Sequence, residues 1–373
     1  MKRILYTLLA GLIMSSCMKS VSISTMRPAE INIPNSVQTI VLVDRTKYER
    51  EGLSILEGVL TGEGINEDRD GVLALFSALQ NNLRSSPRFV IKQESQRLLG
   101  NSLTGAFPDP LSWRIVEDLG RRHGADAVLA VEVFDSDMIV TNGKRQKKRT
   151  VETKDGKKVE EEYTEYYAEG VGGIRAGIRL YNIQDRSIED QEIFTQNRTW
   201  ESSATSLREA MAGLIAKGRA TQYLGSSVGA TYAGKIAPMP VYLSRTYYAK
   251  PKKNSYMNKG SRQASVNDWD GAIDTWKQGI NQTSDSDLRG RFAYNIALGY
   301  EVLGDFRQAK DWASRAYVDY GEKKGRAYAS QLDYRMQQEA ILDEQLSQPE
   351  EQPTTNKTNT QDLNSPLILK KKD

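Results

Sequence analysis

The amino-acid sequence predicts an α/β domain with a mixed sheet over residues 36–248, followed by an all-helical module over residues 249–346. In the first region, short apolar runs alternate with segments of helical period, which is the pattern of an α/β layered domain. In the second region, helical hairpins follow one another without an intervening strand. A chain of 373 residues, of which 39% are hydrophobic, is long and apolar enough to form more than one core.

The first 17 residues have the order of a secretory signal peptide. Lys2 and Arg3 precede an apolar run from Ile4 to Met14, and two serines lead to Cys17, the only cysteine of the chain. The apolar run is shorter than the roughly 20 residues that a membrane-spanning helix needs. The order resembles the lipobox of bacterial lipoproteins, with Met14 in the aliphatic position. This resemblance implies that residues 1–16 are cleaved and that acylated Cys17 anchors the chain in a membrane, because each buried CH₂ of a lipid chain contributes about 0.8 kcal/mol.

Residues 17–35 contain Ser and Pro and show no sustained period, so we expect a flexible tether there. The residues that follow Cys17 include no acidic cluster of the kind associated with export of such lipoproteins to the cell surface. We therefore expect the protein at the periplasmic face of the outer membrane.

The α/β region begins with the apolar run Ile40 to Val43, which predicts a strand that is buried on both faces. Residues 68–83 have helical spacing, and Asp68 and Asp70 lie at the start, where the helix dipole favours acidic residues. A second short strand is predicted at 88–92. A helix that ends at Gly124 and a third buried strand at 125–134 complete the alternation.

A strongly charged segment over residues 143–165 contains Asp155-Gly156, which is typical of a tight hairpin turn. We expect a solvated β-hairpin there, with a patch that binds phosphate or lipid headgroups as the alternative. Two strands over 172–200 extend the sheet, a helix follows to about Gly225, and residues 241–248 return as an edge strand.

The order of these elements, "IVLVDRT", a helix, "RFVI" and "ADAVLAVEV", resembles the α/β domain of CsgG-like, LpoB-like and TolB N-terminal envelope proteins. The resemblance covers about residues 36–235 and depends on the pattern of elements. It implies a binding or assembly domain of the cell envelope.

The segment "AYNIALGYEVLGDFRQAKDWASRAY" resembles a tetratricopeptide repeat, with Ala293 and Ala313 as departures from its aromatic positions. An upstream helix has the matching spacing of a preceding repeat, and residues 327–346 suit a capping helix. Residues 347–373 are rich in Pro, Thr and Asn, and we expect them to be disordered. The positions that match the repeat pattern are Ala272, Trp276, Ile296, Ala297, Tyr300, Gly304, Phe306, Ala309 and Ala316.

The tetratricopeptide resemblance implies a concave surface that binds an extended peptide or a helix of a partner protein. On this resemblance Asn295 can hydrogen-bond a partner backbone. The alternatives are a solvated helix face and a face buried against the neighbouring domain. The residues implied to face the groove are Arg291, Tyr294, Asn295, Leu298 and Glu301.

Candidate catalytic residues do not form a consistent set. Ser227 lies in "GSSVG", which matches G-x-S-x-G, but a nucleophile elbow follows a strand and its histidine comes later in the chain. The only histidine, His123, precedes Ser227 and lies at a predicted helix end. Asn66, Asp68 and Asp70 resemble the start of a calcium loop, whose twelfth position is Ser77 instead of Glu.

We therefore predict a non-enzymatic, lipid-anchored envelope protein that acts as an interaction scaffold or adaptor through its helical module. One Cys and one His exclude a Cys/His metal site, and no cofactor or small-molecule substrate is inferred. A net charge of +3 gives no basic surface for nucleic acid. The alternatives are a subunit or activator of an envelope export or cell-wall assembly and, less favoured, a serine hydrolase at Ser227. The layout as a whole resembles uncharacterised lipoproteins of Bacteroidota.

Overall fold

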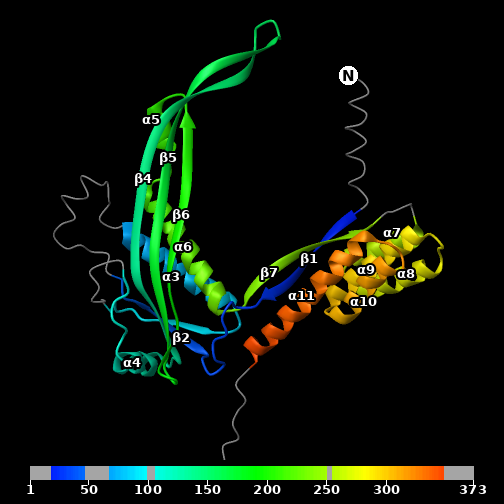
Figure 1. Cartoon of the computed structure of the whole chain (residues 1–373), viewed down its shortest axis with the longest axis horizontal. Helices are drawn as coiled ribbons and strands as arrows, with labels where there is room; N and C mark the ends of the chain where they lie inside the picture. The colour runs from blue at the N-terminus through cyan, green and yellow to red at the C-terminus, as the bar shows by residue number, and fades with distance from the viewer. Residues whose placement is uncertain (1–17, 47–66, 99–105, 250–253, 348–373) are drawn as a thin grey trace, which may run out of the picture.

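The computed structural model describes residues 18–46, 67–98, 106–249 and 254–347 (Figure 1). An α/β domain with a mixed sheet is followed by an all-helical module, which confirms the predicted fold class. The predicted signal peptide, Cys17 and the predicted tail from residue 348 lie outside the described residues. None of the helices that the structure describes is long and apolar enough to span a membrane.

The main sheet has five strands in the order β3-β2-β4-β5-β6. Strand β2 lies between β3 and β4 and runs parallel to both, whereas β5 runs antiparallel to both β4 and β6. The strands are β2 (Thr39–Asp44), β3 (Val90–Gln93), β4 (Ala127–Glu152), β5 (Lys158–Asn182) and β6 (Ser187–Ala204).

Helices cover both faces of the parallel end of the sheet. The core against α3 and α6 includes Ile40 and Leu42, and the core against α4 includes Val41 and Val43. The prediction that this apolar run is buried on both faces is therefore confirmed. The helices are α3 (Glu67–Ser85), α4 (Trp113–His123), α5 (Leu207–Gly213) and α6 (Lys217–Ile236).

A separate two-stranded sheet, which we call the ribbon, consists of β1 (Met18–Arg27) and β7 (Met239–Tyr248). The strands are antiparallel and pair along their whole length, from Met18 opposite Tyr248 to Arg27 opposite Met239. The expectation of a flexible tether over residues 17–35 is therefore wrong for residues 18–27. Alternating Val21 and Ile23 pack toward the helical module, and the pairing partner lies more than 200 residues away along the chain.

The helical module consists of capped helices in hairpin succession. Asp268, Asp285 and Asp305 each accept a hydrogen bond from a backbone N–H in the first turn of the following helix. Gly304 ends α9 at φ 83°, a left-handed conformation that favours glycine, as the repeat pattern predicts for the turn. The helices are α7 (Ser255–Ser265), α8 (Trp269–Asn281), α9 (Ser286–Leu303), α10 (Phe306–Val318) and α11 (Lys323–Leu346).

The repeat positions predicted from the sequence lie mainly in the interior of this module. Ala272, Trp276, Ile296, Ala297, Ala309 and Ala316 are fully buried, and Tyr300 and Phe306 pack against the same core.

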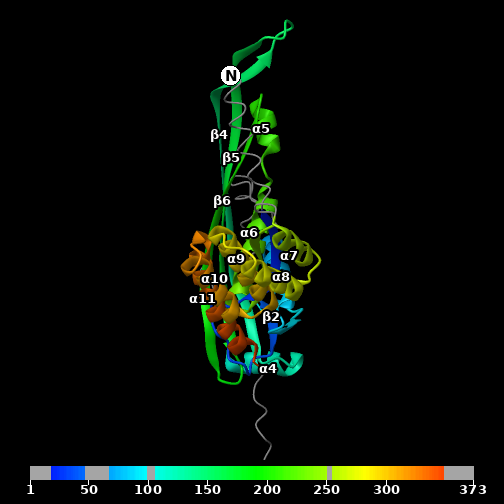
Figure 2. The same cartoon turned by 90° about the vertical axis from the view of Figure 1, so that its right-hand side faces the viewer.

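The far end of β4 and β5 forms a two-stranded projection, which we call the arm (residues 144–165). β6 ends at Ala204, opposite Tyr166, so β4 and β5 continue alone to the tip. The arm extends beyond the helices and the helical module in both views (Figures 1 and 2). The predicted charged hairpin is confirmed, but its turn is longer than two residues, because the Thr153 N–H donates to the Lys157 carbonyl. Gly156 has φ 73° within this turn.

Candidate functional site: the inner face of the helical module

The residues predicted to face a partner lie on α9, and the ribbon occupies the face that they form. Ile23 and Tyr247 of the ribbon share one apolar core with Met257 of α7, Ile296 of α9 and Tyr328 of α11. Figure 1 shows the ribbon lying along these helices. The inner face of the module is therefore filled by strands of the same chain.

Asn295 clamps the backbone of β7. Its side chain is fully buried, and its Oδ1 accepts the Tyr248 N–H at 2.8 Å, while its Nδ2 donates to the Tyr248 carbonyl at 2.7 Å. Both polar groups of one backbone residue are thus satisfied by a single amide. This is the contact expected for a partner peptide, made here with the chain's own strand.

Glu301 anchors the ribbon through charge. Its two carboxylate oxygens accept hydrogen bonds from Nε and a terminal nitrogen of Arg245 at 2.9 and 3.0 Å. The Tyr328 hydroxyl also donates to Glu301, at 2.5 Å. Burial, together with the negative charge of Glu301, raises the pKa of Tyr328 well above its usual value, which keeps this hydroxyl protonated as a donor.

Aromatic contacts complete the face. The Tyr294 ring lies 5.8 Å from that of Tyr248 and 5.2 Å from that of Tyr328, and burial raises the pKa of Tyr294. The Arg291 guanidinium lies 5.2 Å from the centre of the Tyr248 ring, and Leu298 is buried.

The structure therefore brings all five predicted residues together, but it does not leave them open to a partner. Tyr294, Asn295, Leu298 and Glu301 are each at most 8% exposed. The expectation of an open groove is therefore wrong, because strands of the same chain cover this face. An apolar helix face flanked by an amide and a carboxylate suits any extended strand, and the sequence does not distinguish a strand of the same chain from a foreign one.

A second amide fixes the segment that leaves the ribbon. The Gln345 side chain of α11 accepts the Ala29 N–H at 2.8 Å and donates to the Ala29 carbonyl at 3.2 Å. Because Gln345 is 5% exposed, this contact is buried like that of Asn295. Amides of two helices therefore hold β7 and the chain after β1.

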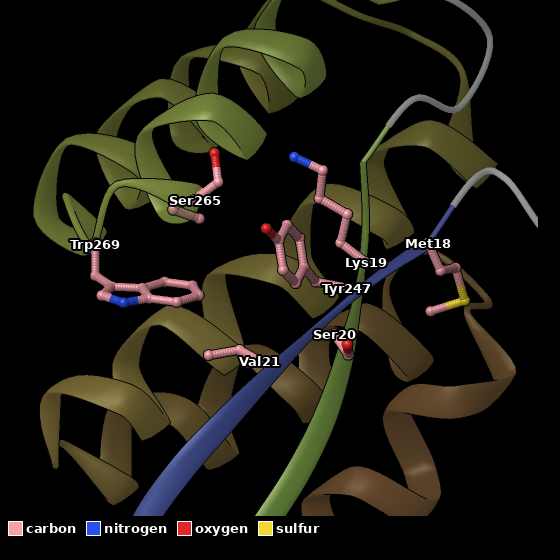
Figure 3. Close-up of a pocket in the computed structure, with 8 residues that line it drawn as sticks. Met18, Lys19, Ser20, Val21, Tyr247, Ser265 and Trp269 are labelled. Atoms are coloured by element: carbon pink, nitrogen blue, oxygen red, sulfur yellow. The ribbon is translucent and has the colours of Figure 1, made fainter.

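A hollow of about 490 Å³ lies beside the start of the ribbon (Figure 3). Its aromatic wall consists of Tyr247 and Trp269, whose ring centres are 6.1 Å apart in an edge-to-face arrangement. Among the described residues, the lining includes one charged side chain, that of Lys19, and no carboxylate or histidine, so these residues offer no acid–base pair. The lining residues are Met18, Lys19, Ser20, Val21, Tyr247, Ala264, Ser265 and Trp269.

The structure places Ser227 inside α6, away from any strand-to-helix turn. The glycines of "GSSVG" have a packing reason: a Cβ on Gly225 would lie 2.3 Å from the Gly71 carbonyl oxygen of α3, and a Cβ on Gly229 would lie 2.4 Å from that of Leu75. α6 packs on one face of the sheet and α4, which carries His123, on the other. The motif therefore serves close helix packing.

His123 is the last residue of α4, as predicted for a helix end, and its Nε2 lies 3.2 Å from Glu94. Arg122 donates to the same carboxylate at 2.5 Å. The backbone N–H of Gln96 is the largest cause that holds the pKa of Glu94 at about 2, and hydrogen bonds from His123 and Arg122 add to it against the opposing effect of burial. Glu94 is thus an ionised structural acceptor.

Asp68 and Asp70 lie in the first turn of α3, as predicted. Asp68 accepts a hydrogen bond from Ser136, and Asp70 accepts one from Gln222. Within the described ranges no group of three potential metal ligands occurs, and Asn66 lies outside them.

A buried charge network is the feature that sequence reasoning missed. The Glu132 side chain is completely buried and lies 2.5 Å from Arg45 and 2.8 Å from Arg179. The Tyr181 hydroxyl donates to Glu132 at 2.9 Å and accepts the Leu111 N–H at 3.0 Å. The signal was a lone glutamate inside the apolar run "AVLAVEVF", which requires a buried cation. The network ties the segment before α4 to the sheet.

Comparison with protein families assigns the two regions separately. Residues 37–248, more than half of the chain, match the family described as "Domain of unknown function (DUF8603)". The chain belongs to this family. Residues 258–340, which lie within α7 to α11, match a second description, "Domain of unknown function (DUF6340)".

Two solved structures illustrate the level of similarity. A PelC dodecamer structure from Paraburkholderia phytofirmans is 13% identical, with coverage of 59% of this chain and 99% of that chain and a TM-score of 0.25. The hypothetical protein CT253 from Chlamydia trachomatis is 12% identical, with coverage of 53% and 97% and a TM-score of 0.22. These scores are too low to support an inference about this chain. No curated protein matches it.

Proposed function

We propose that the protein is a non-enzymatic, lipid-anchored scaffold of the cell envelope that presents its arm to a protein partner. The observation that carries the proposal is the arm itself, which extends past the end of β6 (Figure 1). Both of its strands have solvent-exposed charged side chains. An exposed strand pair whose backbone edges are open can bind another chain by strand addition.

The proposal takes Cys17 as the lipidated residue and the periplasmic face of the outer membrane as the location. β1 begins at the next residue and pairs with β7, which the helical module grips through Asn295 and Glu301. The helical module therefore holds β7, and through β7 the strand β1 that follows the proposed anchor. This role differs from an adaptor groove, because Asn295 and Glu301 on the inner face already have partners within the chain.

A second candidate is a subunit of an envelope export or cell-wall assembly. The open edge of β6 favours it: among the described residues, β6 pairs with β5 on one side, and no strand pairs with it on the other over 18 residues. Edges of this length are normally covered or interrupted in proteins that stay monomeric.

The test compares the intact chain with a chain in which Asn-Gly replaces residues 146–164. Arg145 and Glu165 are direct cross-strand partners, so a two-residue turn closes the shortened hairpin. Crosslinking in cells is followed by purification from membranes. A partner captured by the intact chain and lost from the shortened chain supports the proposal. A partner captured equally by both overturns the role of the arm.

The anchor is tested separately by Cys17→Ser. We expect loss of incorporated labelled fatty acid and release of the protein from the membrane fraction. Retention of the label in this variant would exclude Cys17 as the lipidated residue.

A further inference from the structure

The two strands of the arm carry opposite charges. Residues 144–149 of β4, "KRQKKR", contain five basic residues and no acidic one, whereas residues 160–165 of β5, "EEEYTE", contain four acidic residues and no basic one. Over these residues one edge of the arm is therefore basic and the other acidic, whereas Glu152 of β4 and Lys158 of β5, next to the turn, have the reverse signs.

Within one arm these charges face one another across the strands. Arg149 lies 2.9 Å from Glu161, and Lys148 lies 3.6 Å from Glu162. Both pairs are at register positions directly opposite in the ladder. The four side chains are between 50% and 70% exposed, so solvent screens these pairs and they stay available to charges outside the hairpin.

Both backbone edges of the arm are open. In the part of the chain that the structure describes, β4 over 144–152 and β5 over 158–165 pair only with each other. Every second N–H and C=O of each strand therefore points away from the hairpin, toward the position that a third strand would occupy.

We infer that the arm binds the arm of a second copy of this chain, with the basic β4 edge of one copy against the acidic β5 edge of the next. The inference rests on the proposed function, since it names the partner of the arm. An identical copy offers strands of matching length and opposite charge. Its β4 lies antiparallel to the first copy's β5, so the hydrogen-bonding pattern of the hairpin continues from one copy to the next.

The other pairings between two copies are excluded by charge. β4 beside β4 places basic residues together, and β5 beside β5 places acidic residues together. The favoured contact joins two different edges, so it repeats from copy to copy and generates a ring or a row in which all arms point the same way. This arrangement keeps all anchors on one side of the assembly.

A charge-neutral swap tests the inference. In the swapped chain Lys148→Glu and Arg149→Glu are combined with Glu161→Lys and Glu162→Lys, so each cross-strand pair is kept with its polarity reversed. Full chains with two different affinity tags are purified in mild detergent, mixed at low salt and captured through one tag.

We expect wild-type chains to capture wild-type chains and swapped chains to capture swapped chains. Capture between wild-type and swapped chains should fall at least tenfold, because two like-charged pairs meet at the contact. Self-capture should also weaken as salt rises. Equal capture in the mixed and matched samples, or a monomer by native mass spectrometry for the wild-type chain, would overturn the inference.

The two proposals fail in different ways. If the wild-type chain is monomeric but still captures another protein through the arm, the self-assembly inference is wrong and the scaffold proposal stands. If shortening the arm changes no capture at all, the scaffold proposal itself is wrong.

Discussion

The ribbon and the arm are both two-stranded antiparallel structures, and they are stabilised in opposite ways. The ribbon lies against helices that bury Ile23 and Tyr247 and satisfy the Tyr248 backbone through Asn295. The arm has ion pairs across its strands, extends beyond the helices (Figures 1 and 2), and is continuous with the main sheet at its base. An isolated two-stranded ribbon is marginal in water, so each needs its own support. The enclosed ribbon is structural, and the open arm is the surface that we propose for an external partner.

The largest expected effect is at the buried pair on the ribbon. Glu301→Ala leaves Arg245 without its carboxylate, and we expect a loss of about 4 kcal/mol in the free energy of unfolding. Urea unfolding followed by tryptophan fluorescence measures it, because Trp269, Trp276 and Trp312 lie in the helical module. The control is Asp333→Ala, which removes an exposed pair with Lys310 and should cost about 0.5 kcal/mol or less. Similar losses of unfolding free energy in the two variants would contradict the role of Glu301 in holding β7.

Asn295→Leu tests whether an uncharged side chain of α9 also holds β7. The substitution leaves the N–H and C=O of Tyr248 unpaired in a buried place, and we expect a loss of about 2–3 kcal/mol. Hydrogen exchange should show faster exchange at the Tyr248 amide and unchanged protection in β2. Unchanged exchange at Tyr248 would mean that the amide does not hold the strand.

A pH-dependent effect on stability is expected at Glu94, which belongs to neither the ribbon nor the arm. Its folded pKa of about 2 lies below the unfolded value of about 4.3, so the ionised carboxylate stabilises the fold above about pH 4.3 and this contribution is lost as pH falls toward 2. Glu94→Gln should cost roughly 2 kcal/mol at pH 7, less than the roughly 3 kcal/mol that the full pKa difference corresponds to, because the Arg122 partner is 45% exposed and solvent screens the pair. Unfolding of both chains between pH 7 and 2 measures the difference, which should shrink below pH 4.3. A difference that is constant with pH would exclude the carboxylate charge as its cause.

The smallest effect is expected on the arm. Glu161→Gln removes an exposed cross-strand partner of Arg149 and should change the free energy of unfolding by about 0.5 kcal/mol or less. The change should disappear in 1 M salt, where the Debye length falls to about 3 Å. A loss above about 2 kcal/mol in the free energy of unfolding would mean that the arm, like the ribbon, is structural, and the contrast between them would be wrong.

Elements with a local signal were predictable from the sequence. The run Ile40–Val43, the helix that ends at Gly124 and the repeat positions Trp276 and Gly304 all follow from periodicity and end signals that lie within a few residues. The charged hairpin was predictable for the same reason, since its turn and both strands are contiguous.

Features that depend on distant pairing were not predictable. Val21 and Ile23 alternate with serines as a strand would, but their partner strand begins at Met239, and the serines suggested a tether. The inner-face residues, including Asn295, were correctly grouped, whereas their occupant depends on where β7 goes after the main sheet. The sequence shows Glu132 as a lone charged residue in an apolar run. Its partners Arg45 and Arg179 lie on two other segments, so the pairing could not be predicted.

The register of β1 has a mechanical consequence. The strand runs lengthwise from Met18 to Arg27 beside β7, and its hydrogen bonds are perpendicular to that direction. Under the proposed anchor at Cys17, a pull directed along the strand axis loads the β1–β7 pairing in shear. The load is then shared by the whole set of interstrand bonds instead of opening them one at a time. If Cys17 is the anchor, as we propose, a lengthwise pull on this attachment is resisted by the whole ribbon.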